Sequence, residues 1–112
     1  MLSLERKGDR LVAYISGELD HHKCTIIRKK IDTVVQQERP NILELDYSQV
    51  QFMDSSGIGL VMGRCKKVAA LGGQFIVCGM NENIKRIFTM CGLQKIVTMT
   101  DNLEDITEVL ER

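Results

Sequence analysis

The sequence has no tryptophan and few other aromatic residues, only three phenylalanines and two tyrosines among 112 positions. This shortage argues against a surface that stacks the bases of single-stranded nucleic acid, and it predicts a core of aliphatic side chains. Net charge is lacking too, because fifteen basic and fifteen acidic residues cancel to a formal charge of zero at pH 7. Without an overall positive field, neither nucleic acid nor an anionic membrane is an expected partner.

Long apolar runs are also missing. No segment approaches the roughly 18 consecutive apolar residues of a membrane-spanning helix, and the opening residues MLSLERKGDR lack the hydrophobic stretch of a signal peptide. We therefore expect a cytoplasmic protein that does not contact membranes.

The four cysteines show none of the C-x-x-C spacings that are typical of zinc sites and redox pairs. Cys24, Cys65 and Cys91 fall on the apolar faces of expected helices, and Cys78 lies inside an apolar strand. Cysteine in such positions acts as a small buried hydrophobic residue. We expect no disulfide, no metal ion and no cofactor.

The patterns that are present suit a single domain over residues 1–112. Alternating or short continuous apolar runs predict an edge hairpin over residues 2–15 and strands at 41–47, 75–78 and 96–97. Apolar residues three and four apart predict helices that begin near residues 20, 55, 81 and 101. The expected fold is α/β, with a mixed sheet of four to five strands, the later ones parallel, and about four packed helices.

The stretch QFMDSSGIGLVMGRC, residues 51–65, places an aspartate and two serines where a predicted strand becomes a helix. Asp54 or Ser55 can cap this helix, because a short side-chain oxygen accepts from unpaired N–H groups of the first turn. Gly57 and Gly59 keep that turn free of bulk. A cap needs only one of the polar side chains, so this junction is the predicted working site.

A hydrolase is the first alternative for this junction, because Ser55, Asp54, Asp20 and His21 or His22 include the residue types of a catalytic triad. The serine does not stand in the G-x-S-x-G motif of hydrolases. The glycines match neither of the two common phosphate-binding motifs, so at most weak nucleotide binding is expected. We assign no catalytic residue and no metal ligand.

A serine at a helix N-terminus is well placed to be phosphorylated. The phosphate adds about −1.5 to −2 charges, which the helix dipole tolerates. A partner docked on the same surface tolerates that charge far less, and a binding switch follows. The residues alone leave open whether Ser55 or Ser56 is the acceptor.

Four segments resemble the STAS domain family: GELDHH at 17–22, FMDSSGIGLVMGR at 52–64, GGQFIVCG at 72–79 and IKRIFTMCGLQKI at 84–96. Within that family, the likeness is to the anti-sigma factor antagonists, and most of all to those of sporulation, which act on anti-sigma-F factors. The resemblance implies a single STAS domain that regulates transcription by switching partners and is not an enzyme.

The resemblance also implies the partners and the site. In this family the unphosphorylated domain binds an anti-sigma factor and frees a sigma factor. The anti-sigma factor is itself a serine kinase, and a serine phosphatase reverses its action. Carried onto this sequence, the phosphorylated residue is Ser55, while Asp20, Asp54, Ser56 and Gly57 complete the partner-binding surface. The alternative within the family is an antagonist that controls a general stress sigma factor by the same chemistry.

Overall fold

The computed structural model describes residues 1–100. The elements of this part follow one another as β1 (Leu2–Lys7), β2 (Arg10–Leu19), α1 (His21–Glu38), β3 (Ile42–Met53), α2 (Ser55–Ala70), β4 (Gln74–Cys78), α3 (Glu82–Met90), a 3-10 helix (Leu93–Lys95) and β5 (Thr98–Thr100). The α/β class is as predicted, and so are the first three helices. The fourth expected helix, which begins near Asp101, lies outside the described residues.

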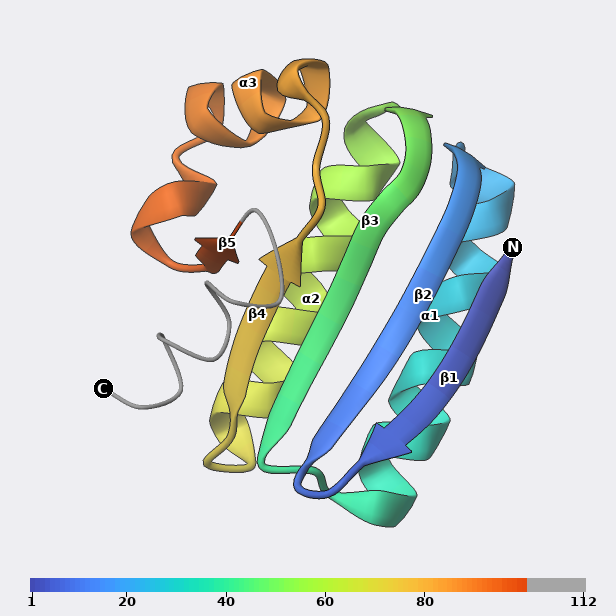
Figure 1. The fold of residues 1–112 in the computed structure, drawn as a ribbon, viewed down its shortest axis with the longest axis vertical. Helices are drawn as coiled ribbons and strands as arrows, with labels where there is room; N and C mark the ends of the chain where they lie inside the picture. Colours follow the sequence, from blue (N-terminus) through green and yellow to red (C-terminus); the bar gives the residue numbers. More distant parts are fainter. Residues whose placement is uncertain (101–112) are drawn as a thin grey trace.

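The strands form one mixed sheet in the order β1-β2-β3-β4-β5. β1 and β2 make the predicted antiparallel edge hairpin, and each later neighbour is parallel, also as predicted. Because right-handed crossovers that advance in one direction leave their helices on one side, α1 and α2 cover the same face of the sheet (Figure 1). The carboxyl ends of β2 and β3 therefore meet at one edge, where both helices begin.

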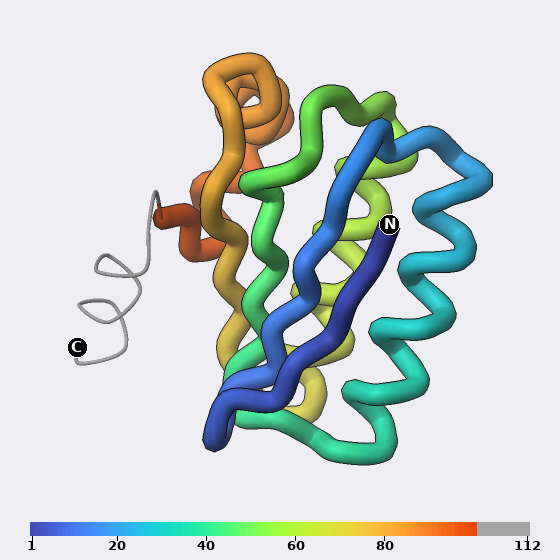
Figure 2. Tube along the Cα trace, turned by 45° about the vertical axis from the view of Figure 1, so that its right-hand side comes forward, coloured from blue at the N-terminus to red at the C-terminus, as the bar shows by residue number. Residues whose placement is uncertain are grey.

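The core fills the space between the sheet and these two helices, and it is mostly aliphatic. Leu11, Ile15, Leu43 and Leu45 point from the strands toward Ile27, Ile31, Leu60 and Val61 of the helices, and all are buried. β4 is buried on both faces, as its continuous apolar run predicts, because Ile76 and Cys78 form a second small cluster on the opposite side. Figure 2 shows α3 at the end of the sheet, apart from the two helices that run along its face.

The strand ends differ from the expectation. β3 does not end near Tyr47 but continues to Met53, and β2 continues past Gly17 to Leu19. The predicted strand at 96–97 is wrong by two residues. Ile96 and Val97 both donate their backbone N–H to the carbonyl of Leu93, which holds them in a turn, and β5 begins only at Thr98.

Burial of the cysteines is as predicted for Cys24 and Cys78, and Cys65 is half-buried. The prediction is wrong for Cys91, which is exposed because it follows the last turn of α3 as its C-cap. All four thiols are free.

Candidate functional site

The candidate site lies where β2 and β3 end side by side. Leu19 and Met53 are paired in the parallel register of these strands, and the N–H of Asp54 donates to the carbonyl of Leu19 at 3.3 Å. The residue after each strand is an aspartate, Asp20 in one case and Asp54 in the other. The structure thus brings together two predicted site residues that stand far apart in the sequence.

Each aspartate caps the helix that follows it. Asp20 Oδ1 accepts from the N–H of Lys23 at 2.9 Å, and Asp54 Oδ1 accepts from the N–H of Ser56 at 2.8 Å. Of the two capping candidates in the second helix, the structure therefore selects Asp54 over Ser55. Both carboxylates remain exposed, so this end of the molecule presents two negative charges beside two helix N-termini.

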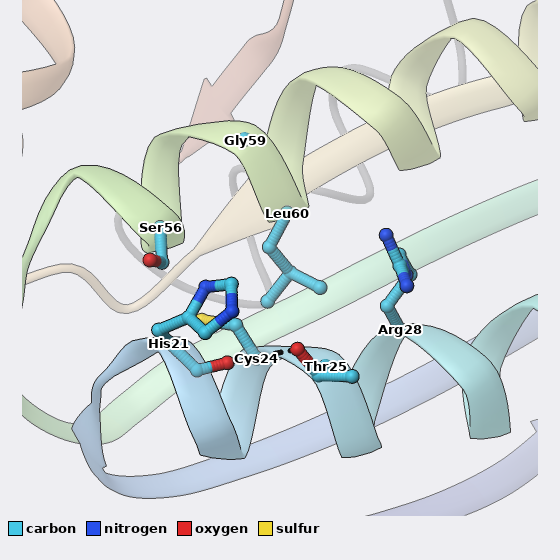
Figure 3. Close-up of a pocket in the computed structure, with 7 residues that line it drawn as sticks. All are labelled: His21, Cys24, Thr25, Arg28, Ser56, Gly59 and Leu60. Carbon is cyan, nitrogen blue, oxygen red and sulfur yellow. Dashed lines mark hydrogen bonds between the residues drawn. The ribbon is translucent and has the colours of Figure 1, made fainter.

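The two serines have different surroundings. Ser55 is the first residue of α2 and is exposed, and the described residues offer no hydrogen bond to its hydroxyl. Ser56 is half-buried and lines a cavity of about 210 Å³ between α1 and α2, with His21, Cys24 and Leu60 (Figure 3). His21, one of the two histidines of the triad alternative, thus shares its cavity with Ser56 and not with Ser55.

The two glycines near the start of α2, Gly57 and Gly59, serve different purposes. Gly57 is buried against Met53, and a Cβ at this position would lie 2.7 Å from Met53 Sδ. A Cβ at Gly59 would meet nothing within 4 Å. The bare backbone of Gly57 is therefore required by packing, whereas Gly59 lines the cavity between α1 and α2 and leaves it open.

A network of ion pairs fixes α1 against α2 further along. Nε of the buried Arg64 lies 2.6 Å from Oδ1 of Asp32, and Nζ of Lys67 lies 3.3 Å from Oδ2 of the same carboxylate. Burial lowers the pKa of Arg64, and the Asp32 carboxylate opposes that effect. The two helix N-termini of the candidate site are thus held in a fixed arrangement.

The one cluster among the described residues that has metal-ligand types lies in the sheet, away from this site. Atoms of Glu44, Asp46 and Cys78 lie within 4.8 Å of one another. Glu44 is already paired with Arg10 at 3.2 Å and accepts from the Cys78 thiol at 3.7 Å. Burial, together with the smaller effect of the nearby carboxylates of Glu44 and Asp46, raises the pKa of Cys78 to about 12. The thiol therefore keeps its proton at neutral pH and is a poor metal ligand.

Two residues near the site were missed by the sequence reasoning. Phe52 is 60% exposed at the end of β3, and Asn81 joins that end of β3 to α3 through its side chain. The sequence signals Asn81 as a possible helix cap, but its contact with β3 depends on tertiary structure.

None of the described helices is long and apolar enough to cross a membrane.

Comparisons with known proteins agree over nearly the whole chain. The anti-sigma F factor antagonist of Paenibacillus polymyxa is 37% identical over 101 residues, which are 90% of this chain and 86% of the relative. The solved structure of the anti-sigma factor antagonist SpoIIAA in its unphosphorylated form is 31% identical, covers 100% of this chain and 98% of its own, and gives a TM-score of 0.84. The Bacillus cell fate determinant SpoIIAA in the phosphorylated form is 32% identical, with coverage of 97% and 99% and a TM-score of 0.76. A model of the STAS domain family matches residues 1–106, and the chain belongs to that family.

Proposed function

We propose that this STAS domain is an anti-sigma factor antagonist whose affinity for its partner is switched by phosphorylation of Ser55. The unphosphorylated form binds the anti-sigma factor and releases a sigma factor in the cytoplasm. The anti-sigma factor phosphorylates Ser55 with ATP, and a serine phosphatase restores the binding form. The domain itself is a substrate and a binding module, not an enzyme.

The observation that carries this proposal is the exposure of Ser55. Asp54 caps α2, so the hydroxyl of Ser55 is not needed by the helix and stands open to another enzyme. Ser56 faces α1 across a cavity, which makes it the poorer acceptor. The family resemblance points to the first serine as well, and the two arguments are independent.

The physical consequence of phosphorylation is local. A dianionic phosphate at the first turn of α2 is stabilised by the helix dipole, so the domain need not refold. A docked partner meets that phosphate together with the carboxylates of Asp20 and Asp54. Juxtaposed like charges at an interface cost several kcal/mol, and each ~1.4 kcal/mol is a tenfold change in affinity.

The proposed pathway is sporulation, with this protein as a positive regulator of sporulation-specific transcription. The 37% identity to an anti-sigma F factor antagonist supports this assignment. The rival is a general stress sigma factor. Titrating the purified protein with an anti-sigma F factor and, in parallel, an anti-sigma-B factor distinguishes the two by which one binds more tightly.

The decisive experiment incubates the protein with the anti-sigma F factor and ATP, followed by intact-mass and fragment analysis. We expect one added phosphate on Ser55. The Ser56→Ala variant should still be phosphorylated, and Ser55→Ala should not. A phosphate on Ser56, or none on either serine, contradicts the proposal.

A further inference from the structure

Phe52 is the unusual residue at the edge of the candidate site. The other two phenylalanines, Phe75 and Phe88, are buried, whereas Phe52 is 60% exposed. A single exposed apolar side chain needs no explanation by itself. What sets Phe52 apart is that the strand is built to turn it outward.

The backbone of β3 contains an extra residue next to Phe52. In the β2–β3 register Gly17 pairs with Val50 and Glu18 pairs with Phe52, so Gln51 has no counterpart. Side chains of a regular strand alternate between faces, and Val50 faces the core. Without the extra residue Phe52 would share that orientation. The bulge at Gln51 instead turns Met53 into the core and Phe52 toward solvent.

Asn81 holds this bulge in place. Pairing between β3 and β4 ends at Asp46 and Cys78, so the last residues of β3 have no neighbouring strand on the β4 side. Asn81 supplies the missing donors, because its Nδ2 donates to the carbonyls of Val50 at 3.3 Å and Gln51 at 3.2 Å. Its Oδ1 accepts from the N–H of Ile84 at 2.9 Å and so caps α3. In Figure 1 this end of β3 lies beside the start of α3.

We propose that Phe52 is an apolar anchor for the anti-sigma factor that binds the surface around Ser55. Asn81 is the positioning residue that keeps the side chain of Phe52 turned toward solvent. The inference rests on the proposed function, because it assigns Phe52 to the same partner surface. Aromatic side chains are enriched among the few residues that dominate protein interfaces. The anchor reaches the partner beside Ser55, which explains why the strand exposes it here.

The surroundings of Phe52 indicate the kind of pocket that receives it. Glu18 is its neighbour on β2 and is exposed, and the exposed carboxylates of Asp20 and Asp54 lie at the ends of the same two strands. Lys23 adds one positive charge on this side, with its Nζ close to Gly17. At these strand ends three carboxylates face one ammonium group, and their complement on the anti-sigma factor is an apolar pocket edged by basic side chains.

The first test compares Phe52→Ala with a matched control, Leu71→Ala. Leu71 is 41% exposed but lies at the far end of α2 from Ser55. Affinity is measured by titration with the cognate anti-sigma F factor in the absence of ATP. We expect Phe52→Ala to bind roughly 30-fold more weakly, and Leu71→Ala to bind within about twofold of the parent, as a surface residue outside the interface should. If Phe52→Ala also binds like the parent, the anchor is wrong.

The same titration includes Ser55→Asp, so that two failures can be told apart. If Ser55→Asp binds like the parent, the proposed switch fails. If Ser55→Asp binds weakly while Phe52→Ala and Leu71→Ala behave alike, the switch stands and only the anchor is overturned.

The second test isolates Asn81 with the variant Asn81→Asp. A carboxylate still caps α3, but it cannot donate to the carbonyls of Val50 and Gln51. If Asn81 acts through Phe52, Asn81→Asp should weaken binding about tenfold when it is introduced into the parent. In the Phe52→Ala background the same substitution should change the affinity by no more than about twofold, and a double-mutant cycle measures this difference. An equal loss in both backgrounds, or no loss in the parent, overturns the positioning role.

Discussion

Asp20 and Asp54 occupy equivalent places in the fold. Each follows a strand of the parallel pair β2–β3, and each accepts a hydrogen bond from a backbone N–H in the first turn of its helix. The equivalence gives Ser55 its surroundings, with one carboxylate directly before it in the chain and a second at the end of the neighbouring strand.

The charge of Asp54 can be removed while its cap is kept. Asn caps helices about as well as Asp, so Asp54→Asn should fold normally. A carboxylate near phosphoserine disfavours the dianion, and its loss should lower the second pKa of the Ser55 phosphate by about half a unit. The measurement is a phosphorus NMR titration of the phosphorylated parent and variant at low salt. An unchanged phosphate pKa would place Asp54 outside electrostatic reach.

Substitution of Ser55 should separate the two states of the switch. Ser55→Ala should bind the anti-sigma factor as tightly as the unmodified protein and remain bound when ATP is added. Ser55→Asp, which places a carboxylate at the same point, should bind at least about tenfold more weakly. Calorimetric titration of both variants, with and without ATP, checks this. Equal affinities for the two variants would show that charge at Ser55 does not govern binding.

The two glycines should respond oppositely to alanine. Gly57→Ala forces a Cβ against the buried Met53, and overpacking costs about 1–3 kcal/mol, against about 1 kcal/mol gained in helix propensity. We expect a net loss of stability. Gly59→Ala meets open space and should stabilise the protein by about 0.5–1 kcal/mol. Urea unfolding of both variants tests the pair, and a stabilising Gly57→Ala would contradict the packing shown here.

The ion pair between α1 and α2 should be costly to break from one side. Asp32→Ala leaves the buried Arg64 without its carboxylate and should destabilise the fold by about 2–4 kcal/mol. The double variant Asp32→Leu with Arg64→Met removes both charges and should recover most of that loss. Denaturant unfolding measures the three free energies. A double variant as unstable as Asp32→Ala would show that the charges themselves are not the cause.

Glu44 should give the protein a specific pH dependence. Burial raises its pKa above the usual 4.5, and the nearby Arg10 only partly offsets this. Because the folded state binds this proton more tightly than the unfolded state, its contribution to stability falls as the pH rises from about 4.5 to the raised value. Glu44→Gln should remove that component. The check is the difference between the parent and variant curves of unfolding free energy against pH, which should be flat outside this window.

Local patterns predicted those parts of the fold that depend on local sequence. The helices, the parallel strands and the helix starts near residues 20 and 55 follow from apolar spacing and short polar side chains, whereas the choice of Asp54 over Ser55 as the cap required the structure. The length of β3 did not, because the polar residues after Tyr47 resemble a loop until the pairing with β2 is known. The bulge at Gln51 and the amide bonds of Asn81 are likewise set by contacts between distant segments.

The distinction between Ser55 and Ser56 has the same origin. Both serines are polar, adjacent and near a helix start, and no local rule separates them. Their difference comes from the rotation of α2 relative to α1, which turns Ser56 toward His21 and leaves Ser55 outside. The apolar core and the ion pair between Arg64 and Asp32 join the two helices in this arrangement.

The end of the sheet opposite Ser55 is tied together by backbone bonds. The carbonyl of Asp9 accepts from the N–H groups of Asn41 and Ile42, and the carbonyl of Asn41 accepts from the N–H of Gln74. These hydrogen bonds connect the starts of β2, β3 and β4. The exposed turn around Gly8 projects from this end, and because the φ of +60° at Gly8 favours glycine, its exposed neighbours Lys7 and Asp9 are the positions to modify. A fluorophore or surface-attachment group placed in that turn would leave the opposite end free, so that binding can be followed on immobilised or labelled protein without touching the surface that is read.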